Sequence, residues 1–355
     1  MPLYMDIHTV DTDEFSAEDV VKAHMEDLAI QDNFGVKQLK YWVNEQAKTI
    51  FCLMEGPDKD ACNQVHLQSH GNTACNIIEV ADNEYNLFMG QGSDINDLAT
   101  TNSGELDPGY RTILLTNIVA FKKEDQEIHR QVLKVITDHN GIIVREPDHQ
   151  TMATFMYADD AITCATALKE LFDVKNESLE YNLAVVSGRP VDEEGETFFK
   201  ETKLRVNGLC ALGLNRMLYL DKETIALSNK ELSGHYEKHN NFTVLDNDDL
   251  RFSTYLSKII QDNLTRSDFT TAGLFTSLGF SKSQASRKIK VLTGMSPNQL
   301  IQESRLLTAL SAMGNSQKTI AEIGYDSGFN SPTYFTRVFK KRFRVSPTDF
   351  ALQLV

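Results

Sequence analysis

Four histidines near the amino terminus have the residue type and spacing of metal ligands. His66 and His70 lie four residues apart, so a helix would place both imidazoles on one face. His8 lies in an alternating segment typical of a strand, and His24 lies in the middle of a predicted helix. Imidazole nitrogen is a suitable ligand for nickel, zinc or copper. We therefore predict a metal site here, and keep open the alternative that these are surface or hydrogen-bonded histidines.

A second set of residues, near the carboxyl terminus, could bind nucleic acid. Two short predicted helices carry hydroxyl, amide and cationic side chains away from their apolar residues. Candidates for contact with base edges lie early on the two helices: Lys282, Ser283, Gln284, Ser286, Ser331, Pro332, Thr333 and Thr336. Candidates for phosphate contact are cationic: Arg287, Lys288, Lys290, Arg337, Lys340 and Lys341. Each of these could instead be a solvated surface residue.

The distribution of charge supports the second interpretation. The formal net charge of the 355-residue chain is −15, which by itself argues against nucleic acid as a partner. From residue 251 to the end, however, 14 Lys and Arg stand against 6 Asp and Glu, and the first 250 residues hold 21 against 44. An acidic body followed by a basic segment predicts that only the carboxyl-terminal part meets phosphate.

Helical periodicity positions these cations in residues 246–355. Tyr334, Phe335, Val338 and Phe339 recur at spacings of three and four, which predicts one apolar face of a helix. A glycine turn precedes this helix, and a polar residue and Pro332 suit its start. An equivalent pair of helices is predicted over 270–277 and 282–293, and a connecting helix joins the pairs. Short helices joined by a tight turn suit reading of the major groove.

The stretch TIAEIGYDSGFNSPTYFTRVFKKRFRVSPTDF resembles the second helix-turn-helix of the AraC/XylS family of bacterial transcription regulators. The resemblance implies two helix-turn-helix units that bind successive major grooves of double-stranded DNA. It also implies that an arginine at Arg287 can make an internal salt bridge. Gly324 stands where the family has alanine, and Arg344 where it has glycine. A glycine inside a helix costs about 1 kcal/mol, so we expect Gly324 to loosen the second unit slightly.

Residues 1–82 read as one small domain with strands and helices in the order β-α-β-β-α-β, which is ferredoxin-like. The first strand, Leu3–Val10, alternates and is predicted to be half-buried. The segments MDIHTV, AEDVVKAHMEDLAIQ, LKYWVNE, FCLMEGPD and VHLQSHG resemble a small family of unknown function, some of whose members bind nickel. The resemblance implies nickel, or another transition metal, as a ligand, although no cofactor is expected to be required.

Residues 83–110 contain no arginine or lysine and are rich in Asn, Asp, Gly, Ser and Thr. This composition predicts an acidic, extended linker that buries little.

Residues 111–245 repeat the order β-α-β-β-α-β and predict a second ferredoxin-like domain. The region resembles the catalytic domain of class III nucleotide cyclases. In that family a metal-binding aspartate would stand at Asn117, a second near Asp148, and a catalytic arginine at Ala211. Two-metal phosphoryl chemistry needs these charges. We therefore expect a degenerate domain with a dimerising or ligand-sensing role. Nucleotide binding without catalysis, or a working nucleotide cyclase with a DNA-binding tail, is the alternative.

The cysteine pattern and the absence of long apolar runs suggest a cellular location. The five cysteines form no CxxC motif, which predicts reduced thiols, and Cys52 alternates with Phe51 and Leu53 as a small core residue would. Neither a signal peptide nor a run of about 18 apolar residues is recognisable. We therefore expect a cytoplasmic protein that does not span a membrane.

Together these patterns predict a multidomain protein, α+β and then all-α: two ferredoxin-like sandwiches followed by an AraC-type double helix-turn-helix domain. The expected function is sequence-specific binding of promoter DNA as a homodimer, without enzymatic activity. The amino-terminal domains would sense a small-molecule or metal effector or dimerise. Metal storage is a further alternative.

Overall fold

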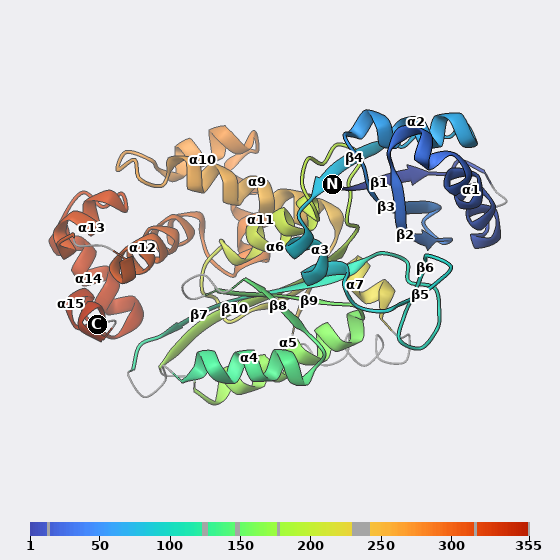
Figure 1. The fold of residues 1–355 in the computed structure, drawn as a ribbon. Helices are drawn as coiled ribbons and strands as arrows, with labels where there is room; N and C mark the ends of the chain where they lie inside the picture. The colour runs from blue at the N-terminus through green and yellow to red at the C-terminus, as the bar shows by residue number, and fades with distance from the viewer. Residues whose placement is uncertain are drawn as a thin grey trace. The chain divides into compact units, whose positions relative to one another are not determined.

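The computed structural model describes residues 1–355 except 13–14, 123–126, 146–149, 176–177, 229–241, 316–317 and 354–355 (Figure 1). The chain forms two compact units. The first contains residues 1–112, 154–157 and 187–203, and the second contains 113–153, 158–186 and 204–355. Among the described residues, no helix is long and apolar enough to span a membrane.

The first unit is built on a six-stranded sheet in the order β4-β1-β3-β2-β6-β5. Its first four strands are β1 (Leu3–Thr9), β2 (Lys37–Asn44), β3 (Thr49–Glu55) and β4 (Asn76–Val80). The helices between them are α1 (Ala17–Ile30), the 3₁₀ helix η1 (Gln31–Phe34) and α2 (Lys59–Ser69). These strands pair antiparallel in the order 4-1-3-2, which confirms the predicted ferredoxin-like fold.

Helices α1 and α2 cover the same face of this sheet. Local signals explain where they begin and end: Asp58 accepts a hydrogen bond from the backbone of Ala61 at the start of α2, and Gly35 ends η1 in the left-handed conformation. Tyr4, Tyr41 and Met54 on the strands pack with residues of α1 and α2 in one apolar core.

The prediction that residues 83–110 form an extended linker that buries little is wrong. Residues 82–110 form α3 (Asp82–Met89), β5 (Ser93–Ile95) and β6 (Leu98–Thr100), and β6 pairs with β2 at the edge of the sheet. Phe88 and Met89 are completely buried, and Tyr110 lies against Phe51 on the sheet. The few apolar side chains in this polar segment cover the second face of the sheet.

Residues 82–110 also explain why β1 differs from its prediction. The strand β1, predicted to be half-buried, is buried on both faces from Tyr4 to His8. The second face is closed by Asp107, which accepts a hydrogen bond of 3.1 Å from the Trp42 indole. Asp107 is in turn held by two hydrogen bonds from Arg111, so its buried charge is neutralised.

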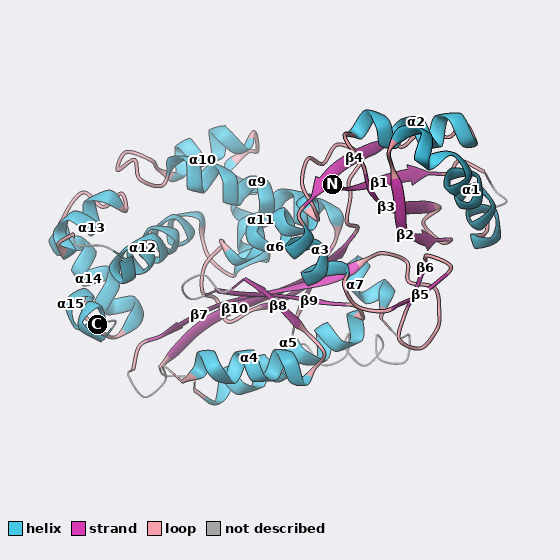
Figure 2. Cartoon of the chain, in the orientation of Figure 1, coloured by secondary structure: helices cyan, strands magenta, loops and turns pink. Residues whose placement is uncertain are grey.

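The second sheet has the order β12-β11-β10-β7-β9-β8. Its strands are β7 (Arg111–Ala120), β8 (Ile142–Arg145), β9 (Gln150–Phe155), β10 (Leu179–Gly188), β11 (Leu218–Asp221) and β12 (Thr243–Leu245). The helices are α4 (Ile128–Asp138), α5 (Ala158–Val174), α6 (Lys200–Cys210) and α7 (Lys222–Leu227). Figure 2 shows α4 and α5 side by side along one face of this sheet. Strands β10, β7, β9 and β8 repeat the 4-1-3-2 order of the first sheet, as expected for the predicted ferredoxin-like fold, while the parallel additions β11 and β12 were not predicted.

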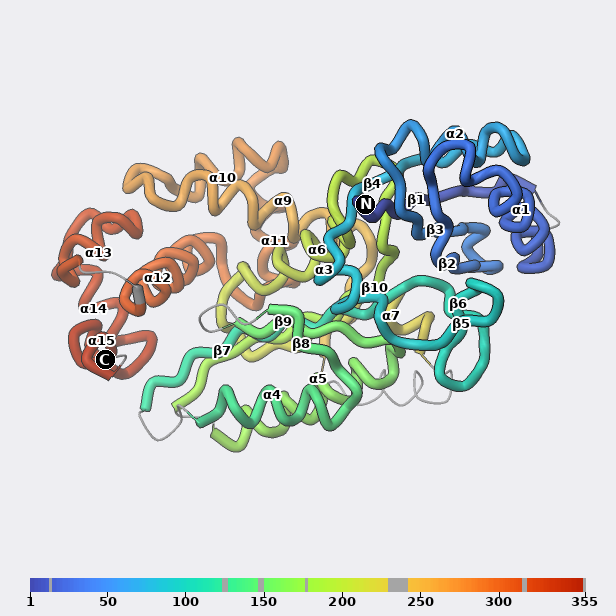
Figure 3. The backbone as a smooth tube through the Cα atoms, viewed as in Figure 1, coloured from blue at the N-terminus to red at the C-terminus, as the bar shows by residue number. Residues whose placement is uncertain are grey.

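After β12 the described residues form helices and no strands, drawn in orange and red in Figure 3. They are α9 (Asn247–Asn263), α10 (Thr271–Leu278), α11 (Lys282–Thr293), α12 (Pro297–Asn315), α13 (Ile320–Asp326), α14 (Pro332–Phe343) and α15 (Pro347–Gln353). Helix–turn–helix pairs α10–α11 and α13–α14 flank the connecting helix α12, which confirms the predicted all-α region. Ser331 caps α14, as the sequence suggested, and full capping boxes at Ser281 and Thr319 begin α11 and α13.

Within the second unit, the carboxyl-terminal helices share a core with the sheet. Phe121, which follows β7, stacks on Phe343 with ring centroids 4.8 Å apart and lies 5.3 Å from Phe350. Tyr219 of β11 donates a hydrogen bond of 3.0 Å to the carbonyl of Leu292 in α11. Residue 246 therefore marks the change from strands to helices, but the apolar core continues across it.

Gly324 also has a packing role, which the sequence did not indicate. An alanine Cβ at this position would lie 2.9 Å from the ring of Phe335, which is fully buried in α14. The glycine therefore lets α13 approach α14 closely.

We expect Gly324→Ala to destabilise the chain by about 1–3 kcal/mol, because overpacking outweighs the gain in helix propensity. Gly273→Ala in α10 is the matched control, since its Cβ would lie 3.6 Å from Phe269, an ordinary contact. The control should be neutral or stabilise by up to about 1 kcal/mol. Urea unfolding of both variants measures the difference, and equal stabilisation by both alanines would contradict this account.

Candidate metal centre and nucleic-acid interface

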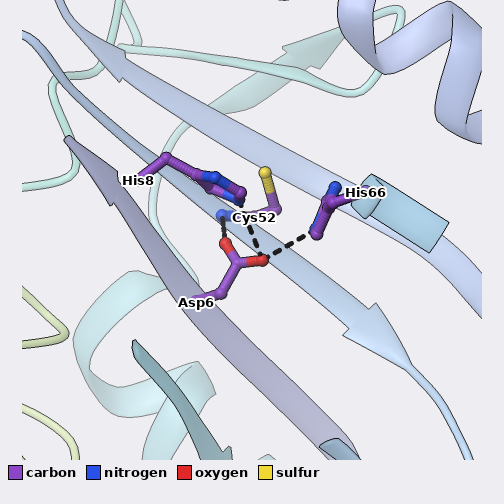
Figure 4. Close-up of side chains that lie close together, drawn as sticks. All are labelled: Asp6, His8, Cys52 and His66. Atoms are coloured by element: carbon purple, nitrogen blue, oxygen red, sulfur yellow. Dashed lines mark hydrogen bonds and ion pairs between the residues drawn. The ribbon is translucent and has the colours of Figure 1, made fainter. Parts of the chain in front are cut away.

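The first unit contains a buried group of potential metal ligands beneath its helices. Asp6 and His8 come from β1, Cys52 from β3 and His66 from α2, and one ligand atom of each lies within 4.8 Å of all the others (Figure 4). Asp6 and His8 are two residues apart on the central strand, so they project from the same face. Cys52 reaches that face from the neighbouring strand, and its backbone N–H donates a 2.9 Å hydrogen bond to Asp6.

A second group of potential ligands shares His66 with the first. Asp27 of α1 and His70, the residue after α2, join His66 within the same 4.8 Å limit. The helical spacing between His66 and His70 therefore does place both imidazoles on one side, as predicted, with ring centroids 5.6 Å apart. Every residue of the two groups except Asp6 lines a single cavity of about 510 Å³.

His66 holds two buried carboxylates in place. Its Nε2 lies 2.8 Å from Asp6 Oδ2 and its Nδ1 lies 2.9 Å from Asp27 Oδ2. Carboxylates only accept hydrogen bonds, so satisfying both requires a doubly protonated, cationic imidazole. Burial opposes this charge, but the hydrogen bonds to Asp27 and Asp6 prevail and raise the pKa of His66 to about 10.

The two carboxylates show the reciprocal effect. Burial would raise the pKa of Asp6, but His8 and His66 overcome it and hold that pKa well below its usual range. For Asp27, burial is likewise outweighed by hydrogen bonds from His66 and His70, which lower its pKa. Burial and the nearby aspartates raise the pKa of the Cys52 thiol. The group is thus an acidic pocket in which one protonated imidazole balances one of the two carboxylate charges.

The donor set fits a borderline transition metal. Imidazole, thiolate and carboxylate together suit nickel, zinc or copper, and each can bind only after losing its proton. His66 would have to release a proton in order to bind, so a metal would replace the positive charge that now neutralises Asp6 and Asp27.

The sequence identified only part of this site. His8, His66 and His70 are brought together, whereas His24 lies apart against Tyr41, with ring centroids 4.3 Å apart. Asp6 and Asp27 were missed, although Asp6 shares a strand face with His8. Cys52 is buried, as the alternation predicted, but its sulfur also lies among the candidate ligands.

We call α11 and α14 the first and second reader helices, because they carry the residues predicted to contact DNA. Helix α11 presents most of these residues to solvent. Lys282, Ser283, Gln284, Arg287 and Lys290 are exposed, while Ser286 and Lys288 are half-buried. Two of the predicted residues also have structural contacts. Gln284 Oε1 accepts a 3.2 Å hydrogen bond from the Ser281 backbone, and Lys288 Nζ lies 5.1 Å from the Phe252 ring centroid.

The second reader helix, α14, has a clearer exposed face. Thr333, Thr336, Arg337, Lys340 and Lys341 are all exposed, and Ser331 caps the helix just before Pro332. The apolar residues predicted from spacing, Phe335, Val338 and Phe339, are buried on the opposite side, but Tyr334 is exposed.

One cation of α14 points inward and was missed by sequence reasoning. Arg342 donates hydrogen bonds of 2.9 Å to each carboxylate oxygen of Glu303 in α12, 3.0 Å to Glu180 and 2.7 Å to the carbonyl of Leu214. Burial raises the pKa of Glu303 despite the attraction of Arg342, and the two carboxylates raise the pKa of Arg342. This ion-pair network fixes the end of the second reader helix to the sheet.

The residues at the predicted cyclase positions form no set of metal-binding carboxylates. Asn117 and Ala211 line one cavity of about 320 Å³, which also contains serine and leucine side chains of α9 and α12. No Asp, Glu, Lys or Arg side chain is among the described residues that line it. Asp148 lies outside the described residues.

Two parts of the chain match known protein families. Residues 274–353 match the family described as a helix-turn-helix domain, and residues 4–80 match the family described as nickel responsive protein SCO4226-like. The carboxyl-terminal helices are therefore an AraC-type helix-turn-helix domain, and residues 4–80 are a SCO4226-like domain. Both resemblances predicted from sequence are confirmed for these segments, whereas the cyclase resemblance stays a prediction.

Individual relatives cover only parts of the chain. Histidine kinase P4 of Formosa agariphila is 36% identical over 93 residues, which is 26% of this chain and 7% of the kinase. The transcriptional activator RhaS of Yersinia pestis is 35% identical over 68 residues, 19% of this chain and 25% of the activator. The crystal structure of SCO4226 from Streptomyces coelicolor is 32% identical with a TM-score of 0.21, covering 22% of this chain and 94% of that one. The chain thus spans a quarter or less of these two sequence relatives.

The charge on His66 predicts a pH dependence of stability. The pKa of His66 rises from 6.5 to about 10 on folding, so protonation stabilises the fold fully below pH 6.5 and this contribution is lost as pH approaches 10. We expect the metal-free chain to lose unfolding free energy across this interval, by at most about 1.4 kcal/mol per pH unit.

Urea unfolding of the wild type and of His66→Gln, at several pH values, isolates this contribution as the difference between the two curves. The difference should shrink with rising pH, because only the wild type carries the titrating imidazole. A difference that stays constant from pH 6.5 to 10 would show that His66 is not a buried cation.

Proposed function

We propose that this protein is a DNA-binding transcription regulator whose amino-terminal domain responds to a transition metal, nickel in the first instance. One observation carries the proposal: two helix-turn-helix units, each with an exposed polar and cationic reader helix, are joined by the single helix α12. A rigid connection of this kind suits two reader helices that enter successive major grooves of one duplex.

Different residues would perform the two parts of DNA recognition. Lysines and arginines neutralise phosphates without regard to sequence, and the exposed candidates are Arg287, Lys290, Arg337, Lys340 and Lys341. Hydroxyl and amide side chains early on the helices would read base edges, and Thr333 and Thr336 are the most exposed of these on α14. Gln284 would contribute only through its amide nitrogen, because its oxygen caps α11.

The candidate metal centre would supply the response. Asp6, His8, Cys52 and His66, or Asp27, His66 and His70, would hold the ion. Because His66 must give up its proton, binding would break hydrogen bonds that link β1, α1 and α2. A change of this kind inside the domain is the physical basis of a sensor, and a bacterial cytoplasmic regulator is its natural setting.

The middle domain would serve in assembly. We assign it a dimerising role and no enzymatic activity, because Asn117 and Ala211 lack the charges that phosphoryl transfer requires. A homodimer would place two pairs of reader helices on one promoter, and a small molecule remains an alternative effector to metal.

The double variant Lys340→Ala/Lys341→Ala tests the DNA interface. We expect weaker binding to all duplexes. We also expect the slope of the logarithm of the association constant against the logarithm of the salt concentration to become shallower by about 0.9 for each lost phosphate contact. Fluorescence anisotropy at several salt concentrations measures this, with a duplex selected from a random library by the full chain.

The control is Arg130→Ala/Lys134→Ala, which removes two exposed cations from α4 of the sheet domain. It should leave both the affinity and the salt slope unchanged. If the two double variants lose affinity equally, or if the full chain binds no duplex, the proposed interface is rejected.

Nickel content tests the metal centre. After equilibrium dialysis of the full chain against nickel chloride, we expect mass spectrometry to detect bound nickel that His66→Ala and His70→Ala each greatly reduce. His70→Ala is the milder change, because His70 lies only at the edge of the Asp27 network with its Nε2 3.4 Å from Asp27.

His129→Ala in α4, outside the centre, serves as the matched control and should retain the full nickel content. Circular dichroism verifies that each variant is folded. Nickel binding that is unaffected in both His66→Ala and His70→Ala would remove the proposed site.

A further inference from the structure

The cavity that contains the candidate ligands has room for more than an ion. Its volume of about 510 Å³ falls in the range of sites for small organic molecules. The candidate metal ligands other than Asp6 line one part of it. Its remaining walls include Val20 and Ile50, which are apolar, and Tyr41 and His24, which are polar.

Tyr41 and His24 are buried polar groups whose hydrogen-bonding capacity is unused. Tyr41 is 1% exposed and His24 is 4% exposed. Neither the Tyr41 hydroxyl nor either His24 ring nitrogen makes a hydrogen bond to the described residues; Asp97 Oδ2 is 3.6 Å from His24 Nε2. Buried polar groups normally find partners, and leaving them without one costs free energy. Because both line the cavity, a ligand in the cavity can satisfy them.

Both groups can donate to an anionic oxygen. Burial raises the pKa of Tyr41 to about 12, so its hydroxyl keeps its proton at neutral pH. Burial also lowers the pKa of His24, against the effect of Asp97, which favours a neutral ring with one N–H donor. The two ring centroids lie 4.3 Å apart, so both donors belong to the same part of the cavity wall.

We propose that this cavity binds an α-amino carboxylate, such as a free amino acid, together with the metal ion. The carboxylate would accept hydrogen bonds from Tyr41 and His24, and the amino group would face the metal centre. This inference rests on the proposed metal binding and extends it, because the protein would take the metal as an amino-acid chelate.

The charge of the cavity selects the class of chelator. Asp11 and Asp27 line it, and the described lining residues include no lysine or arginine. A polyanionic chelator such as citrate would therefore be repelled, whereas an amino acid brings one carboxylate and a nitrogen donor. The apolar walls at Val20 and Ile50 would accept the side chain.

Equilibrium dialysis of the full chain with radiolabelled L-histidine, glycine or citrate, each with and without nickel chloride, tests the proposal. We expect L-histidine and glycine to be retained at about one per chain only when nickel is present, and citrate not to be retained. Tyr41→Phe should retain nickel like the wild type but bind the amino acids about tenfold more weakly.

Tyr4→Phe is the matched control, since Tyr4 lies buried on the same face of the sheet but does not line the cavity. It should retain both ligands. Nickel retention without any amino acid, or equal amino-acid retention by the two tyrosine variants, overturns this inference and leaves the metal centre standing. Failure to retain nickel at all rejects both proposals.

Discussion

Two buried carboxylates that need a counter-charge dominate the amino-terminal domain. Asp6 is fully buried on the central strand and Asp27 is 3% exposed on the covering helix. Ionised carboxylates are very costly inside a protein unless they are paired, and His66 pairs with both through its two ring nitrogens. One side chain thereby ties β1, α1 and α2 together. Under the proposed function, a metal ion would supply the positive charge in place of this proton.

The carboxyl-terminal region solves the same problem with a permanent cation. Glu303 of the connecting helix is buried, and Arg342 of the second reader helix neutralises it while also reaching Glu180 at the sheet. Lys340 and Lys341, the neighbours of Arg342, remain exposed. The basic helix therefore uses Arg342 for docking and leaves two exposed lysines, which the proposed function assigns to phosphate contact. Since arginine does not lose its proton at physiological pH, this attachment does not respond to pH as the His66 network does.

Periodicity and capping residues predicted most of the elements, because these signals are local. The alternation in β1 and the apolar spacing in α14 both correspond to elements with those bounds to within a few residues. The prediction for residues 83–110 was wrong because composition is also a local signal. Its composition is polar, yet Phe88, Met89 and Tyr110 are enough to cover a sheet face when the chain brings them there. Composition gives the average polarity of a segment, whereas burial depends on where the fold places its few large side chains.

The sequence by itself determined the β-α-β-β-α-β order within both sheets, the basic character of α11 and α14, and the shared face of His66 and His70. These features depend on neighbours within one or two turns of chain. Only the tertiary structure decided that Asp6, Asp27 and Cys52 join the histidines, that Arg342 points inward, and that Gly324 makes room for Phe335. Each of these is a contact between segments distant in sequence. Such contacts are set by how sheets and helices pack, and residue spacing carries no record of them.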